Sequence, residues 1–381
     1  GIIAREAVAF TSFGHTKILN TIAEIKLIEL LGTLGLIMIV LEAALDLKIT
    51  KERLPLIFKA FLSGLLVLLV TNFGIAAILY LTTSGFDFLQ AMIYACPLAI
   101  LSSAIVIPSV VNLTENSKEF HIYDSTFSDI LGIMIFYFMI ELAEPTSNAV
   151  AVGDFLGGLV ITIFTSVLFS YVLVYVFQNM ETKVKLFLMI AVLLLLYSVG
   201  KMMHLSSLII ILVFGLILSN PKLFFIGPLK KLLDKKALKG IFETFHLITM
   251  ESAFVVRTFF FFIFGFSVSI ASLFDVRVAI ISGAIIIAIY ALRGVILAFL
   301  MKAKEVKLAT LIAPRGLITL LLFYSIPDEL KNENFNSGIL LFVIIITSLL
   351  MTYGLVKFGS KEPTGDVLLS EEPAEGSVQN N

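Results

Sequence analysis

One aspartate lies in the middle of a long apolar segment, and its chemistry is what the rest of the sequence must explain. Asp129 occupies the apolar stretch 121–143. An ionised carboxylate near the centre of a bilayer costs at least ~2.5 kcal/mol, so such residues are rare and usually functional. A transported monovalent cation or a proton is the partner that this position predicts.

Oxygen-bearing side chains are expected close to this carboxylate. Ser125 precedes Asp129 by one helical turn and so shares its face. Glu42 lies in another apolar segment at a depth of roughly 8 Å from the same membrane face, against roughly 12 Å for Asp129. Hard cations prefer oxygen ligands. We therefore expect Asp129, Ser125, Glu42 and Ser128 to bind a cation or a proton, with Asp129 and Glu42 supplying the carboxylates for the transported cation.

Basic and acidic residues inside other apolar segments are further candidates. Arg315 and Arg293 are expected at depths of roughly 12 Å and 10 Å, in the same layer as Asp129. Arg257 is placed near mid-membrane, and Glu251 lies two turns into its segment. The sequence leaves open the directions in which Arg257 and Glu251 face.

The composition places these charged residues in a membrane. Hydrophobic residues make up 59% of 381 positions and charged residues 14%, whereas roughly a quarter of a soluble domain is charged. Mean hydropathy is +1.04. A net charge of -1 gives no reason to expect nucleic acid as a partner, and one cysteine excludes a disulfide framework. The expected partners are the lipid bilayer, a monovalent cation and the proton, with no cofactor.

Apolar segments long enough to cross ~30 Å at 1.5 Å per residue predict about eleven transmembrane helices. They lie near 26–47, 60–82, 88–112, 121–143, 155–177, 185–200, 206–219, 244–270, 276–300, 307–326 and 337–357. We expect one transmembrane domain over 1–358, an amphipathic connector over 220–243 and a short disordered tail over 359–381.

Loop charges predict the orientation of these helices. Lysine and arginine gather in alternate connections, around 48–59, 183–185, 222–239 and 302–307, whereas the other connections are acidic. By the positive-inside rule, residue 1 lies outside and the C-terminus is cytoplasmic. The chain is therefore expected to be a multi-pass protein of the cell membrane.

Two segments carry helix-breaking residues at similar places. Broken helices free backbone groups that protein, water or ions must satisfy, and they often mark transport sites. If 155–177 is a linker, the four helices before it match the last four after it, as an inverted repeat requires. The breaking residues are Pro97, Ser102, Ser103 and Pro108 in the first segment, and Pro314, Arg315 and Gly316 in the second.

Three motifs in this order resemble the monovalent cation:proton antiporter superfamily, especially its sodium/proton exchanger branch. Asp124-Ser-Thr-Phe-Ser-Asp129 resembles its Glu-x-x-x-Asn-Asp motif. Leu-Glu42-Ala-Ala-Leu resembles Phe-Glu-(Gly/Ala)-(Gly/Ala)-Leu, and Ala-Pro-Arg315-Gly is similar to Gly-x-Arg-Gly. The resemblance covers nearly the whole chain and implies an all-α antiporter-like fold, with two broken helices crossing within an inverted repeat.

The resemblance also implies roles for particular residues. Asp129 would bind cation and proton in competition, with Glu42 and Ser125 lining the site, while Asp124 and Arg293 would form a structural ion pair. The exchange of Na+ or Li+ for protons follows from this likeness, and thirteen-helix relatives would place two more helices before this chain begins. Ser128 stands where electrogenic relatives have a second acid, so we expect electroneutral exchange. We also expect a homodimer.

Departures from the family pattern leave alternatives open. Ile105 falls where the Asp of a Thr-Asp-Pro motif would be, and Leu101-Ser-Ser-Ala-Ile-Val106 looks more like the potassium-efflux branch. A K+/H+ antiporter and a passive cation channel or uniporter are therefore alternatives. An intramembrane aspartyl protease is disfavoured, because Asp124 and Asp129 lie ~140° apart around one helix. We expect a transporter rather than an enzyme.

Overall fold

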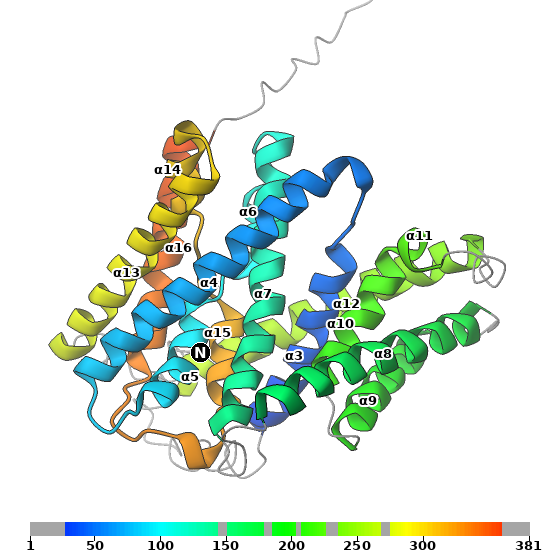
Figure 1. The fold of residues 1–381 in the computed structure, drawn as a ribbon, viewed down its shortest axis with the longest axis horizontal. Coiled ribbons are helices and arrows are strands. Elements are labelled where there is room, and N and C mark those ends of the chain that lie inside the picture. Colours follow the sequence, from blue (N-terminus) through cyan, green and yellow to red (C-terminus); the bar gives the residue numbers. More distant parts are fainter. Residues whose placement is uncertain are drawn as a thin grey trace, which may run out of the picture.

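The computed structural model describes residues 27–143, 151–178, 185–202, 207–225, 235–267 and 275–359, and every regular element within them is a helix (Figure 1). Apart from Gly359, the expected tail lies outside these residues. The intact long helices are α3 (Leu27–Asp46), α4 (Leu54–Thr82), α7 (Glu115–Ala143), α8 (Ala151–Gln178), α9 (Lys185–Met202), α10 (Ser207–Ser219), α12 (Lys235–Ser267), α13 (Val276–Leu300) and α16 (Gly338–Phe358).

The helices follow the predicted spans, with a correction at the connector. The expected connector over 220–243 is wrong in part, because Pro221–Phe224 forms the short helix α11 and α12 begins at Lys235. Helices α4 and α7 also begin earlier than predicted, at Leu54 and Glu115. Hydropathy detects only the apolar part of a helix, whereas the backbone bonding continues through polar turns beyond it.

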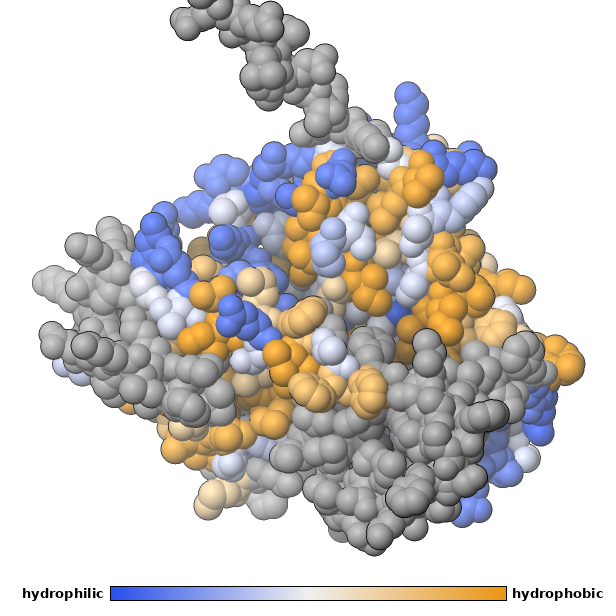
Figure 2. All heavy atoms as spheres, turned by 180° about the vertical axis from the view of Figure 1, so that it is seen from behind, coloured by the Kyte–Doolittle hydropathy of each residue, from blue (hydrophilic) through white to orange (hydrophobic). Residues whose placement is uncertain are grey.

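Several described helices could cross a membrane by length and composition. Figure 2 shows hydrophobic residues over the middle of the visible face and hydrophilic residues gathered toward its upper edge, as a bilayer favours. Among the described residues there are 5 such helical stretches, Lys51–Thr82, Phe88–Ser109, Glu115–Ala143, Val276–Leu300 and Gly338–Phe358.

The described helices pack in two groups that meet along α3. The first group contains α4 to α7 and α13 to α16, and the second contains α3 and α8 to α12 (Figure 1). Helix α3 also contacts α7 and α15 of the first group. Within that group α4 runs down in Figure 1 and α13 runs up, as the predicted inverted repeat requires.

Both predicted helix breaks are present. The first separates α5 (Phe88–Ala99) from α6 (Ser103–Ser109), and the second separates α14 (Ala303–Leu311) from α15 (Leu317–Tyr324). Pro97 and Pro108 remain inside helices, so the first break lies at residues 100–102, directly before Ser103, and not at the prolines. A proline removes one backbone donor, which a helix tolerates within a packed bundle.

Close packing of α3 against α10 generates a test of the packing within the second group. An alanine Cβ at Gly215 would lie 2.7 Å from the Cβ of Ala44, so the helices would have to separate. Overpacking of this kind typically costs ~1–3 kcal/mol, and we expect Gly215→Ala to lower the melting temperature of the detergent-solubilised protein.

Gly157→Ala is the matched control, because a Cβ there meets nothing within 4 Å. We expect it to leave the melting temperature unchanged or to raise it, since alanine favours helix by up to ~1 kcal/mol over glycine. Equal shifts in the two variants would contradict the packing of α3 on α10.

Candidate functional site

Asp129 lies where the first helix break meets α7. Its side chain is 2% exposed, and its Oδ2 accepts a hydrogen bond of 3.2 Å from the backbone N–H of Ser103. Ser103 is the first residue of α6, so this donor is one of the free N–H groups at a helix start. The dipole of the helix favours a negative charge there, so the surroundings suit an ionised Asp129.

The two predicted serines are buried beside Asp129 on the same helix, and they do different things. The Oγ of Ser128 accepts a hydrogen bond of 3.0 Å from the N–H of Leu101, which ties α7 to the break. The hydroxyl of Ser125 donates to the carbonyl of His121 at 2.8 Å. This leaves the lone pairs of the Ser125 oxygen available to a cation, whereas the oxygen of Ser128 is bonded to the backbone.

Glu42 lies on α3, at the seam between the two helix groups. Its side chain is partly exposed, and α3 contacts α7 and α15. One turn later, Asp46 Oδ1 lies 2.8 Å from His246 Nε2 and joins α3 to α12. Among the described residues, no three His, Cys, Asp or Glu side chains gather as a metal site. A cation at Asp129 would therefore rely on hydroxyl and backbone oxygens as well as carboxylates.

The two remaining candidates lie on α12. Glu251 is exposed, in contrast to the buried layer of Asp129. The side chain of Arg257 lies outside the described part of the structure, so its predicted depth stays a prediction. The structure therefore does not bring Glu251 together with the other site residues.

Arg315 binds the backbone carbonyls at the helix breaks. Its fully buried guanidinium donates to the carbonyls of Leu98 at 2.7 Å, Ala99 at 3.2 Å and Ala313 at 2.7 Å. Leu98 and Ala99 end α5, where the helix dipole favours a cation. The N–H of Arg315 donates to the Oγ1 of Thr347 at 3.1 Å. Sequence reasoning missed Thr347, although a hydroxyl in the middle of an apolar helix was the signal available.

The two breaks cross in direct contact. The N–H of Ser102 donates to the carbonyl of Pro314 at 3.0 Å. A Cβ at Gly316 would lie 2.9 Å from the Cδ1 of Ile105 and would also collide with Ser102. Glycine at this position therefore permits the close approach of the two chains, and the predicted residues Ser102 and Gly316 belong to the crossing itself.

Asp124 and Arg293 lie together in the core of the first group. Arg293 Nη2 is 2.8 Å from Asp124 Oδ2, and both side chains are 0% exposed. The Nε of Arg293 also donates to the carbonyl of Ala309 at 2.9 Å. This buried arrangement links α7, α13 and α14, and it directs Asp124 toward an arginine and not toward Asp129.

The buried ion pair predicts a particular pattern of stability losses. Asp124→Asn and Arg293→Gln each leave one charge buried without its partner, which typically costs ~3–5 kcal/mol. We expect the double variant to lose less than the sum of the single losses, because no lone charge remains. The melting temperatures of the unmodified protein, the two single variants and the double variant, all in one detergent, measure the interaction between Asp124 and Arg293. Additive losses would show that the pair contributes nothing beyond its separate members.

Comparison with known proteins identifies the family and the fold. The family model described as "Sodium/hydrogen exchanger, transmembrane" matches residues 10–358. The fold is similar to a structure of the sodium proton antiporter MjNhaP1 from Methanocaldococcus jannaschii at pH 8, with 18% identity and a TM-score of 0.64 over 87% of this chain and 83% of that chain. A second structure of that antiporter, from an electron microscopy map, gives 17% identity and a TM-score of 0.61 over 89% and 87%.

No protein of curated function matches the chain. The structural likeness confirms the predicted antiporter-like fold, and the family match confirms the resemblance that the motifs carried. Since the family model spans nearly the whole chain, this protein belongs to the transmembrane sodium/hydrogen exchanger family.

Proposed function

We propose that this chain exchanges Na+ or Li+ for protons by alternating access, with Asp129 as the residue that carries both ions. The observation that supports this is a buried carboxylate at the crossing of two broken helices, 3.2 Å from the N–H of Ser103. A single carboxylate cannot hold a proton and a cation at the same time. Competition for Asp129 therefore couples the two fluxes in opposite directions.

Ser125 and Glu42 are proposed to complete the cation site. Ser125 lies one turn from Asp129 on α7, with its hydroxyl hydrogen directed to the carbonyl of His121. Glu42 lies on α3, which contacts α7 and α15 from the other helix group. A cation between the groups could therefore take oxygen ligands from both sides, as hard cations prefer.

The seam along α3 is the surface on which alternating access would occur. Transporters built from repeats commonly move one helix group as a rigid body against the other around a fixed site. The crossing breaks, the Asp124–Arg293 pair and Arg315 all belong to the first group, so this group would move as a unit and carry Asp129 with it.

We propose a cell-membrane location with a cytoplasmic C-terminus, supported by the basic connections on one side.

We also propose a homodimer. The exposed apolar side chains of Val160, Phe164 and Leu168 on α8 offer a second copy a surface on which to pack. Light scattering of the purified protein in detergent would measure the number of chains.

Asp129→Asn is expected to abolish cation-dependent proton movement. Asparagine keeps an oxygen that can accept the Ser103 N–H, so the fold should survive, but it takes up neither a proton nor a cation charge at neutral pH. The measurement is the fluorescence of a pH-sensitive dye in proteoliposomes after addition of Na+, Li+ or K+. Glu141→Gln, an exposed acid on the same helix, is the control and should retain exchange. Exchange above background in Asp129→Asn would refute the assignment.

The same cation series tests the alternative ions and a passive channel. A response to K+ alone would favour the potassium-efflux branch, which the segment 101–106 resembles. Exchange predicts a proton flux that reverses when the cation gradient is reversed and that persists with the membrane potential clamped at zero. A cation flux that moves no protons under that clamp would favour a channel or uniporter.

Exchange is expected to be electroneutral, with one cation for one proton. Ser128 cannot titrate, and its oxygen accepts the Leu101 N–H. The guanidinium of Arg293 is paired with Asp124 at 2.8 Å, away from Asp129. In proteoliposomes with an imposed valinomycin and potassium potential, the rate of sodium-driven proton flux should not depend on the potential. A rate that scales with the potential would contradict the single-carboxylate cycle and indicate Glu42 as a second proton carrier.

A further inference from the structure

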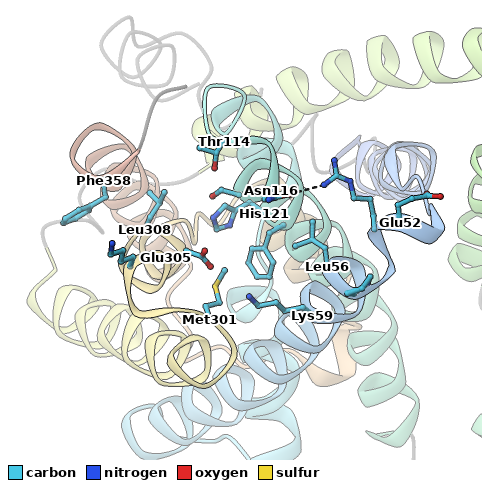
Figure 3. Close-up of a pocket in the computed structure, with 15 residues that line it drawn as sticks. Glu52, Leu56, Lys59, Thr114, Asn116, His121, Met301, Glu305, Leu308 and Phe358 are labelled. Atoms are coloured by element: carbon cyan, nitrogen blue, oxygen red, sulfur yellow. Dashed lines mark hydrogen bonds between the residues drawn. The ribbon is translucent and has the colours of Figure 1, made fainter. Parts of the chain in front are cut away.

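A pocket of about 700 Å³ opens at one end of the first helix group, apart from the crossing of the breaks (Figure 3). Its walls come from the starts of α4, α7 and α14, together with the ends of α13 and α16. These are the ends of the helices that carry the basic connections around 51–59 and 302–307. The pocket therefore lies at the membrane face that the loop charges predict to be cytoplasmic.

Positive groups line one side of this pocket. Helices α4 and α7 start here, so the positive ends of their dipoles lie at this side. The ammonium of Lys59 lies 5.8 Å from the ring centre of Phe120, and among the described residues Lys59 forms no salt bridge within 4.0 Å. Arg53 is engaged, at 3.1 Å from Glu119 and 3.1 Å from Asn116. Lys59 is thus a cation in the wall that is not already neutralised by a carboxylate.

A buried histidine forms the inner end of the pocket. His121 lines it and is 1% exposed, and its Nδ1 has no hydrogen-bond partner among the described residues. Figure 3 shows the imidazole among the other lining residues, toward the space that they enclose. A buried polar atom without a partner is costly, so this nitrogen points to a polar ligand that completes its bonding.

The opposite side of the pocket carries Glu305, Lys304 and apolar side chains. Figure 3 shows the Glu305 side chain directed toward the same space as the Lys59 ammonium. Met301 and Leu308 add apolar surface to the wall. Leu54 and Phe58 on the first turns of α4 are 48% and 67% exposed, so the pocket borders a surface suited to lipid. One ligand that satisfies both walls carries a phosphate and an ammonium group.

We propose that this pocket binds an ethanolamine phosphate ester. The phosphate takes its hydrogen bonds from Lys59 and His121, and the ammonium lies against Glu305. The same chemistry is available from the headgroup of phosphatidylethanolamine in the adjoining leaflet and from a soluble ester. Binding joins the starts of α4, α7 and α14 and stabilises the first helix group.

The test measures the melting temperature of the protein, purified in a phosphate-free maltoside detergent, with dioleoyl phosphatidylethanolamine or with soluble glycerophosphoethanolamine. Near-saturating ligand is expected to raise it by at least ~3 °C. Lys59→Ala and Glu305→Gln should each remove at least half of that rise. Lys307→Ala, an exposed lysine on α14 that does not line the pocket, should keep it in full.

Matched ligands distinguish a lipid headgroup from a soluble ester and from a lipid without phosphate. If only the lipid raises the melting temperature, the ligand comes from the membrane. If both esters raise it, the pocket recognises the phosphate and ammonium groups without the acyl chains. Dioleoylglycerol has the same acyl chains without phosphate and should give no rise. An equal rise with dioleoylglycerol, a rise that both Lys59→Ala and Glu305→Gln retain in full, or no rise with either ester would overturn the proposal.

Discussion

Carbonyl groups left free by broken helices inside a membrane must be bonded by the protein, and Arg315 meets this constraint at the crossing. One buried guanidinium binds three carbonyls, two of them at the end of α5. Without that cation, the break would expose acceptors to an environment with no water to satisfy them. The N–H of Ser102 donates to the carbonyl of Pro314, and Gly316 approaches Ile105 closely. Both contacts lie at the crossing whose free carbonyls Arg315 bonds.

The first break places opposite charges at the helix ends that favour them. Arg315 lies at the end of α5 and Asp129 at the start of α6, so each helix dipole stabilises the charge beside it. Asp124 and Arg293 neutralise each other in the same group. A proton and a monovalent cation each add one positive charge at Asp129. The loaded states of the proposed cycle therefore carry the same net charge, and this permits similar barriers for both steps.

Much of the architecture was predictable because the thickness of a bilayer limits the length of its helices. The apolar segments matched the described helices, and the broken segments were placed correctly. The positions of the breaks were less predictable, since Pro97 and Pro108 lie inside helices while the first break falls at residues 100–102 between them. The sequence placed Arg315 at the second break but did not show that its guanidinium binds backbone carbonyls.

The sequence by itself determined the membrane class, the order of the helices and the residues able to carry charge within them, because hydropathy and helical spacing are local properties. The tertiary structure decided which atoms these residues contact. Arg315 reaches Leu98 across 217 positions of the chain, and Arg293 reaches Asp124 across 169. Such contacts depend on how helices cross, and crossing is set by the packing of side chains from distant segments that no local pattern encodes.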